Sequence, residues 1–370
     1  MKTLLFILIL AFLVYFATVV FLLTGLLRTH AHVRPQNRRV KVSIVVAARN
    51  EAPNIETCLQ ALAQQTYPRE QMQIIIVDDR SEDHTYELAK RFREKCDSEM
   101  IIERVESTPE GMSPKKYALS RGIELANGEI VFTTDADCVP PPEWLAEMVP
   151  QFSENVGMLI GAAPFERSQN ALQKLLSLDN MATALVAAGS AGWNVGVTCT
   201  GRNLAYRKAV YEEVGGFAPI QKSLSGDDDL FLQLVSQRTS WQIRYSLKPK
   251  TAVPSRTVSE FSDFIRQRRR HVSAAKYYAH GIKACYFLFN LSNLILFAFL
   301  VYGVWRTTLF PIAVILFSSK LTVDFLALFL MTRKFDRTNL LSLFLIWEVF
   351  FLFNQVVISP LGFVGKIRWK

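Results

Sequence analysis

The sequence predicts an α/β protein attached to a membrane, in which a soluble body built on a parallel β-sheet is flanked by apolar helices. Two observations support this fold class. Between residues 40 and 280, apolar strands alternate with amphipathic helices, which is typical of parallel strands joined by right-handed crossovers. Outside that body lie four apolar segments, each of the roughly 20-residue length that a bilayer core requires.

The strands of the body are expected from runs of apolar residues that end in polar ones, a pattern of strands buried on both faces. These runs cover residues 40–51, 72–79, 99–105 and 129–137. Helical spacing follows the first two runs. A third helix is expected to begin with Ser113 as N-cap and Pro114 at its first position, and to end at Asn127–Gly128.

The membrane part is expected to consist of one helix before the body and three after it. Residues 4–27 carry no charge, and this run is too long for the apolar region of a signal peptide. We therefore divide the chain into an N-terminal membrane helix, a catalytic domain, an amphipathic interfacial helix and three C-terminal membrane helices. The corresponding ranges are 1–27, 40–255, 256–280 and 284–360.

Basic residues predict the orientation of the body. Residues 28–41 and 266–276 are rich in Lys and Arg and lack acids, so the positive-inside rule places the body in the cytoplasm. The basic tail, residues 365–370, would lie outside after four spans, so a re-entrant or interfacial last segment is the alternative. The net charge of +9 is concentrated at these membrane edges, which favours anionic lipid headgroups over nucleic acid.

Several function classes are disfavoured by what the sequence lacks. Its five cysteines form no CxxC pair, so the sequence predicts neither a disulfide framework nor a zinc cluster. A GxGxxG motif after a strand and a GxxxxGK[ST] motif are both missing, which argues against dehydrogenases and P-loop enzymes.

Acidic residues instead follow three of the expected strands, at the edge where open α/β sheets bind ligands. They are Glu51, Asp78, Asp79, Asp135 and Asp137. Asp135 and Asp137 are two positions apart, so in an extended chain both point to one side. Such a pair suits Mg²⁺ or Mn²⁺, with the oxygens of a nucleotide diphosphate completing the shell. The alternative is a turn whose acids cap the following helix.

The order of the motifs resembles a known family. The stretches "ARNE", "VDDRSED", "SPKKYALSRGIELANGE", "DAD", "TGRNLAYRKAVYEEVGGF", "SGDDDLFLQL" and "QRRRH" follow one another across residues 42–271. They are similar to those of membrane-bound, inverting family 2 glycosyltransferases of bacterial type. That resemblance implies the GT-A fold, a Rossmann-like mixed sheet that binds a nucleotide sugar, here in a multi-pass protein of the bacterial inner membrane.

The resemblance also implies roles on the donor side. Glu51 and Asp79 would contact the base or ribose, and Lys115 would lie near the nucleotide. Asp135 would take part in binding the donor and, with Asp137, the metal ion. The alternative for Asp78 and Asp79 is a turn followed by a helix N-terminus, where acids are favoured by the helix dipole.

On the acceptor side, an aspartate must remove the proton of the attacking hydroxyl. Alignment on Leu230 makes Asp227 the base, whereas alignment on the "GDD" form makes it Asp228; helix capping is the alternative for either. On the amphipathic helix, Arg270 would hold the diphosphate and Gln267 the acceptor end. The sequence departs from the family pattern at His271 in place of Trp, which argues against a long polymer acceptor, and at Ala47 in place of Pro.

Polar residues also occur within the expected membrane helices. Lys320 and Asp324 are four apart and can pair on one face, and Glu348 and Asn354 lie in apolar surroundings. An internal ion pair that fixes helix packing is favoured over a path for the acceptor.

We therefore hypothesise a membrane glycosyltransferase that moves a hexose-type sugar, with inversion, from a UDP-sugar to a lipid-linked or glycan acceptor. The alternatives are a processive polysaccharide synthase and a non-catalytic membrane scaffold that binds nucleotide sugars. The oligomeric state is left open.

Overall fold

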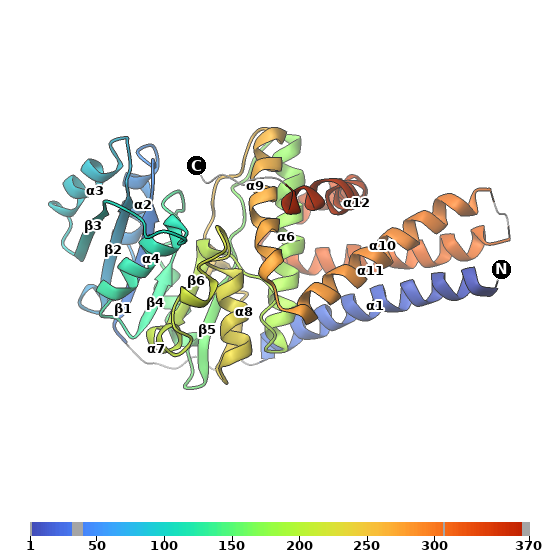
Figure 1. Cartoon of the computed structure of the whole chain (residues 1–370), viewed down its shortest axis with the longest axis horizontal. Coiled ribbons are helices and arrows are strands. Elements are labelled where there is room, and N and C mark those ends of the chain that lie inside the picture. The colour runs from blue at the N-terminus through green and yellow to red at the C-terminus, as the bar shows by residue number, and fades with distance from the viewer. Residues whose placement is uncertain (1, 32–39, 306–307, 365–370) are drawn as a thin grey trace.

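A mixed β-sheet occupies one end of the molecule and a bundle of long apolar helices the other (Figure 1). The structure, a computed structural model, describes residues 2–31, 40–305 and 308–364. Most of the basic stretch at 28–41 and the whole tail at 365–370, which entered the prediction of orientation, lie outside these residues.

The sheet has seven strands in the order β3-β2-β1-β4-β6-β5-β7. The strands are β1 (Val42–Ala48), β2 (Met72–Asp79), β3 (Glu99–Val105), β4 (Ile130–Thr133), β5 (Val156–Gly161), β6 (Leu204–Arg207) and β7 (Gln242–Ser246). The first four strands along the chain pair in parallel, whereas β6 runs antiparallel to both of its neighbours, β4 and β5. The four expected strands are thus confirmed, and β6 makes the sheet mixed rather than purely parallel.

Helices cover the sheet and form the bundle. They are α1 (Lys2–Ala31), α2 (Ile55–Ala63), α3 (Thr85–Arg93), α4 (Pro114–Leu125), α5 (Trp144–Met148), α6 (Ala171–Gly192), α7 (Lys208–Glu213), α8 (Asp229–Arg238), α9 (Phe261–Ser273), α10 (His280–Gly303), α11 (Phe310–Lys334) and α12 (Phe344–Phe353). Short 3₁₀ or π turns flank several of them; those used below are η7 (Thr338–Leu343), η8 (Asn354–Ile358) and η9 (Ser359–Phe363).

The central strands are mostly apolar because both faces of the sheet are covered. Val45, Ile75 and Val77 belong to one hydrophobic core, whereas their neighbours Ile44 and Ile74 belong to another. This alternation follows from the two-residue period of a strand. The two cores hold β1 and β2 rigidly, and so fix the edge at which both strands end.

The register places the acids of different strands at one edge. Ala48, the last residue of β1, pairs with Asp78 of β2, while Val45 of the same strand pairs with Thr133, the last residue of β4. The chain therefore leaves β4 for Asp135 at about the level of Asp78, with β1 between them. Neighbouring strands are about 4.8 Å apart, which separates the two positions by about 10 Å along the edge.

The start of α4 differs from the prediction in one respect. Ser113 stands at the N-cap position and Pro114 is the first helical residue, as expected, but the serine side chain makes no capping bond. Its hydroxyl donates instead to the carbonyl of Leu224, 3.0 Å away. The serine thus ties the beginning of α4 to the loop that precedes α8.

Helix α6 forms a layer between the sheet and the bundle. It contacts β7 on one side and α1, α11 and α12 on the other. At its crossing with α1 three glycines allow the backbones to touch: a Cβ added to Gly192 would lie 1.9 Å from the carbonyl oxygen of Gly25, and one on Gly25 would lie 1.9 Å from that of Gly189. The apolar N-terminal helix is therefore packed into the body, not joined to it by a loose tether.

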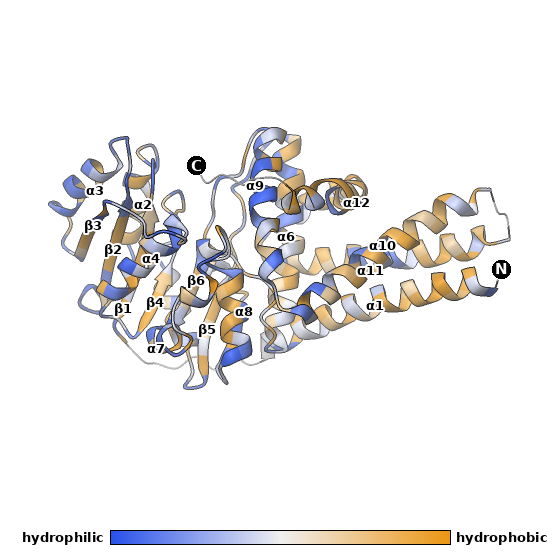
Figure 2. Cartoon of the chain, viewed as in Figure 1, coloured by the Kyte–Doolittle hydropathy of each residue, from blue (hydrophilic) through white to orange (hydrophobic). Residues whose placement is uncertain are grey.

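Within the part of the chain that the structure describes, four helical segments are long and apolar enough to cross a membrane: Lys2–Thr29, His280–Gly303, Phe310–Lys334 and Thr338–Phe363. Their hydropathy distinguishes them from the body, whose outer helices carry many hydrophilic residues (Figure 2). Three of them, α1, α10 and α11, run side by side away from the sheet (Figure 1).

Candidate active site

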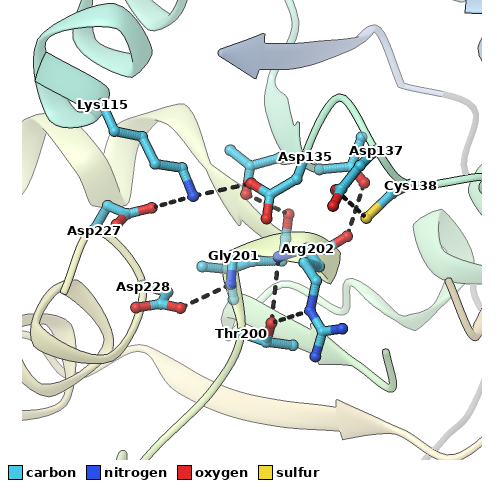
Figure 3. Close-up of polar contacts among 12 residues, drawn as sticks. Lys115, Asp135, Asp137, Cys138, Thr200, Gly201, Arg202, Asp227 and Asp228 are labelled. Atoms are coloured by element: carbon cyan, nitrogen blue, oxygen red, sulfur yellow. Dashed lines mark hydrogen bonds and ion pairs between the residues drawn. The ribbon is translucent and has the colours of Figure 1, made fainter. Parts of the chain in front are cut away.

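Lys115 lies at the centre of the carboxylates that the sequence singled out. Its Nζ is 2.9 Å from Asp135 Oδ1 and 3.0 Å from Asp227 Oδ2 (Figure 3). Lys115 comes from the first turn of α4, Asp135 from the end of β4, and Asp227 from the loop before α8. The donor-side and acceptor-side carboxylates of the prediction therefore meet at one ammonium group.

Lys115 and Asp135 stabilise the ionised form of each other. Burial by itself would lower the pKa of Lys115, but the carboxylates of Asp135, Asp227 and Asp228 outweigh burial and raise that pKa. For Asp135 the balance is reversed: burial opposes ionisation, yet Lys115, Arg202 and Arg270 together lower the pKa of its carboxyl. An ionised lysine beside an ionised Asp135 is the state that this geometry favours.

Asp137 is the less compensated member of the "DAD" pair. Burial and the nearby Asp135 raise the pKa of its carboxyl. Among the described residues no Lys or Arg forms an ion pair with it, and its Oδ1 accepts only a weak bond from the Cys138 thiol, at 3.6 Å (Figure 3). A second positive charge placed between Asp135 and Asp137 would relieve this repulsion.

This donor set fits a divalent cation that shares its shell with a substrate. In the described parts of the chain no three His, Cys, Asp or Glu side chains are grouped as a metal cage. Mg²⁺, however, is commonly held by one or two carboxylates, with phosphate oxygens and water as the other ligands. Asp135 and Asp137 are such a pair of hard oxygen donors.

The three aspartates before α8 have different surroundings. Asp228 is the N-cap of α8: its Oδ1 accepts from the amide of Asp229 at 2.8 Å and its Oδ2 from the amide of Gly201 at 2.9 Å. Asp229 accepts a hydrogen bond from the Tyr278 hydroxyl and another, at 2.8 Å, from the amide of Leu230. Asp227 is the one that faces Lys115 and Asp135 (Figure 3).

A second lysine, Lys116, holds the loop that carries Asp227. The side chain of Lys116 is fully buried, and its Nζ donates to the carbonyls of Ile220, Ser223 and Ser225 at 2.8, 2.7 and 2.9 Å. Burial lowers the pKa of Lys116 to about 8, although Asp227 and the two aspartates after it oppose that shift. The two adjacent lysines therefore act differently: Lys115 pairs with the carboxylates, whereas Lys116 holds the loop that carries Asp227.

The acids expected to bind the nucleoside lie at the same sheet edge. Asp79 is buried and pairs with Arg80 at 2.9 Å, while Glu51 accepts a bond from the Asn54 side chain at 2.8 Å. Glu51 also lies near the "DAD" pair, because all three carboxylates affect the same thiol. Burial, followed by the charges of Asp137, Asp135 and Glu51, raises the pKa of the Cys58 thiol to about 12. Glu51 and Asp79 therefore lie at the same sheet edge as the "DAD" pair.

Helix α9 brings one of its arginines, Arg270, near the same centre. Its charge is among those that lower the pKa of the Asp135 carboxyl, after those of Lys115 and Arg202. Arg268 points another way and pairs with Asp179 of α6, 3.4 Å away. Gln267 lies almost one turn before Arg270 and is half-buried. The structure therefore supports proximity to the cleft for Arg270, whereas Gln267 has no described contact that tests its role.

Residues 43–223 match the family model described as Glycosyl transferase family 2. The chain carries a family 2 glycosyltransferase domain. The family and the enzyme class predicted from the motifs are thereby confirmed. The fold is confirmed as well: a mannosyltransferase from Pyrobaculum calidifontis, solved with GDP-Man and Mn²⁺, aligns with a TM-score of 0.59 over 94% of this chain and 98% of its own, at 18% identity.

Three curated relatives are similar to this chain over different shares of its length. The probable glycosyltransferase YdaM of Bacillus subtilis is 24% identical over 85% of this chain and 80% of its own length. Glycosyltransferase AglE of Haloferax volcanii is 32% identical over 48% of this chain, a match that spans about half, 55%, of AglE. The beta-monoglucosyldiacylglycerol synthase of Trichormus variabilis is 33% identical over 31% of this chain and 24% of the synthase.

Three residues near the centre were not singled out from the sequence. Arg202 lies beside the "DAD" pair of the family 2 domain and acts electrostatically on Asp135 and Asp137; it follows Gly201 in a motif that was recognised only for its glycine. From the sequence, Lys116 could not be distinguished from its neighbour Lys115. Tyr278 contacts Asp229 across 49 positions, and no local pattern could have indicated that contact.

Proposed function

We propose that the protein transfers a hexose-type sugar from a nucleotide diphosphate sugar to a lipid-linked or glycan acceptor, with inversion at the anomeric carbon. The observation that carries this proposal is the ion-paired centre in which Lys115 joins Asp135 to Asp227. It puts a diphosphate-binding edge and a candidate base on two sides of one cleft, which is the arrangement that a single displacement needs.

In the proposed reaction, a hydroxyl of the acceptor attacks the anomeric carbon from the face opposite the diphosphate. The new carbon–oxygen bond forms as the bond to the diphosphate oxygen breaks, and the hydroxyl proton passes to the carboxylate of Asp227. Asp228 is the weaker candidate for the base because both of its oxygens already accept backbone N–H bonds. Bonds of that kind stabilise a helix start and leave less capacity for a proton.

The donor side would hold the leaving group. Asp135 and Asp137 would share a Mg²⁺ or Mn²⁺ ion with the diphosphate; when bound, that ion supplies positive charge that neutralises the leaving group. Lys115 and Arg270 would add charge-assisted hydrogen bonds to the same phosphates. Glu51 and Asp79 would orient the base or ribose. The Mn²⁺ and GDP-Man bound by the Pyrobaculum enzyme of the same fold support this choice of ligands.

A lipid acceptor is proposed because the domain is packed onto apolar helices and because one relative, by its name, glucosylates a diacylglycerol-type lipid. A processive synthase is the alternative, and product length distinguishes it from single transfer. The non-catalytic scaffold considered from the sequence is not supported, because the chain matches a glycosyltransferase family model and relatives that are named glycosyltransferases.

The experiment is a screen of purified protein in lipid nanodiscs against UDP- and GDP-sugars, with Mg²⁺ or Mn²⁺, measuring release of nucleoside diphosphate and the mass of the product. We expect one donor to be turned over in the presence of metal, and Asp137→Asn to lose that turnover while an exposed control, Lys95→Gln, retains it. Absence of turnover with every donor, or an Asp137→Asn variant as active as the wild type, would contradict the proposal.

A further inference from the structure

The last apolar segment, residues 338–364, is as hydrophobic as a membrane span but does not run with the other helices. Figure 1 shows α1, α10 and α11 lengthwise and side by side, whereas α12 is strongly foreshortened and α6 and α9 run crosswise to the bundle. Contacts agree with the picture: α12 packs on α6, η7 packs on α6 and α11, and η9 packs on α9.

Both ends of this segment contact the same short stretch of α6. Near its beginning, Phe344 and Trp347 pack with Leu178 of α6. Near its end, Ile358 packs with Leu176, two residues away on that helix, and with Phe264 of α9. Fourteen residues of helix are about 21 Å long, so a span along the bundle axis would have carried Ile358 far from the layer that Phe344 contacts.

The end of the segment is fastened to the helix that borders the cleft. The Arg269 guanidinium of α9 donates to the carbonyls of Leu361 and Val364, at 3.2 and 3.1 Å. Gly362 is packed so closely on Val272 that an added Cβ would lie 2.8 Å from its side chain. Arg269 thus donates to carbonyls that the end of a helix leaves without a donor. These bonds are made on the side of the molecule where the sheet lies.

The face turned away from α6 and α9 is apolar and exposed. Leu345, Ile346, Val349, Val356 and Val357 are 66, 59, 67, 48 and 46% exposed. Soluble proteins rarely expose so many large aliphatic side chains on one segment, and such a patch marks a contact with protein or membrane. This segment adjoins the other apolar helices: the ring of Phe351 packs with that of Phe289 of α10, and the ring of Phe344 with that of Phe325 of α11. Many large apolar side chains of α10 and α11 are exposed as well.

We propose that residues 338–364 do not cross the bilayer but lie in the plane of its cytoplasmic leaflet, with the exposed face of α12 among lipid acyl chains and the chain end on the same side as the catalytic domain. The lipid is favoured as occupant by continuity with the bundle surface and by the adjoining cations of α9 and of Arg333 and Lys334 at the end of α11, which suit anionic headgroups.

This arrangement resolves a conflict in the charge pattern. Three crossings, by α1, α10 and α11, leave residues 335–337 and everything after them on the side of the body. The basic residues Lys366, Arg368 and Lys370 then obey the positive-inside rule, which four crossings would violate. It also places α6, α9 and α12 as one layer at headgroup depth, next to the candidate active site.

The test places a protease-cleavable epitope tag after Lys370 in the full chain and compares cleavage in right-side-out and inverted membrane vesicles. Two reference tags, one inserted between α10 and α11 and one in the turn at residues 335–337, mark the two sides. We expect the tail tag to be cleaved together with the second reference, in inverted vesicles only. Cleavage together with the first reference would show that residues 338–364 cross the membrane and would overturn the proposal.

A second measurement tests the depth and the occupant. Single spin labels at Ile346, Val349 and Val357, in a variant with its five native cysteines replaced, are read for accessibility to oxygen and to a water-soluble relaxant. We expect one shallow depth in lipid for all three. Ile346 and Val357 would differ by about 16 Å in a spanning helix. Low accessibility to both reagents would show that protein, such as a second copy of the chain, covers this face.

Discussion

Lys115 Nζ lies 3.0 Å from Asp227 Oδ2 and makes a second ion pair, at 2.9 Å, with Asp135. One ammonium therefore keeps a donor-side and an acceptor-side carboxylate together. Without it, two negative charges in a partly buried cleft would repel each other and draw apart or take up protons. The lysine is as much a part of the geometry as the acids that it joins.

Lys115→Gln is expected to lower kcat with the proposed donor by about a hundredfold or more, because displacement of a reacting group by about 1 Å can cost that much. The same change should weaken binding of the nucleotide diphosphate, measured by calorimetry, since a charge-assisted bond to phosphate is lost. Lys95→Gln, an exposed lysine at the end of α3, is the matched control. Wild-type kinetics in Lys115→Gln would show that the ion pairs are incidental.

The two candidate bases, Asp227 and Asp228, differ in their hydrogen bonds. Asp227→Asn should lower kcat by about a thousandfold, the middle of the range for loss of a general base. Asp228→Asn should have a small effect, because asparagine is also a good N-cap and its side-chain oxygen can accept one of the amide hydrogens that Asp228 now accepts. Single-turnover kinetics on both variants check this. The reverse order of the two effects would assign the base to Asp228.

Tyr278 couples the beginning of α10 to α8. Its hydroxyl bonds Asp229, and the amide of Ala279 donates to Gln233 of the same helix at 3.2 Å. Tyr278→Phe removes only the hydroxyl and should lower kcat by about tenfold through a shift of the aspartates, with the KM for the donor unchanged. Tyr302→Phe, near the other end of α10, is the control. A fall in melting temperature without any fall in kcat would assign Tyr278 a structural role alone.

The buried Lys116 gives a pH dependence of stability with a definite sign. Its pKa of about 8 in the folded protein is below its value in the unfolded chain, so the unfolded chain binds more protons between about pH 8 and pH 10.5. The free energy of unfolding contributed by this group therefore rises with pH across that window. Below pH 8 both states are charged and the contribution is constant.

Lys116→Met removes the titrating group, so the comparison isolates it from every other lysine. We expect Lys116→Met to melt at a lower temperature than the wild type, because three carbonyls lose their donor, and the gap to widen from pH 8 to pH 10. Melting curves in one detergent at several pH values measure both. A gap independent of pH would mean that the three carbonyls keep the pKa of the ammonium near its ordinary value.

The strands and the acidic edge could be predicted because their causes are local. A strand covered on both faces must be apolar throughout, and its end is where polar residues such as Asp78 and Asp135 return to the sequence. The parallel order then brings these ends to one edge. Pairing between Lys115 and Asp227 was not predictable in the same way, because 112 positions separate them and only the sheet order brings them together.

The membrane segments show the opposite case. Apolar composition and length are the same for a helix that crosses a bilayer and for one that lies in its plane, so residues 338–364 could be read either way. The packing of Phe344 with Leu178 and of Ile358 with Leu176, within one turn of α6, distinguishes the two, and it depends on the fold. Likewise, the expected ion pair of Lys320 with Asp324 is confirmed at 3.1 Å. The hydrogen bond from Tyr15 to Asp324 and the ion pair of Lys320 with Glu348 could be found only in the structure.

The crossing of α1 with α6 is expected to be essential for the stability of the catalytic domain. At this crossing the carbonyl of Gly25 lies where a Cβ of residue 192 would be, and α6 packs directly on β7. Gly192→Val should therefore force the helices apart at a cost of about 1–3 kcal/mol, as overpacking does in a well-packed core. The melting temperature in detergent and the rate of proteolysis of the body are the readouts.

The matched control is Gly281→Val in the first turn of α10, where an added Cβ meets no atom within 4 Å. Both substitutions place a β-branched residue in a helix and so share the same propensity effect. Only Gly192→Val creates a clash, and only this variant should destabilise the body. Equal melting temperatures for the two variants would show that α1 merely tethers the domain and that the glycine crossing contributes nothing to its stability.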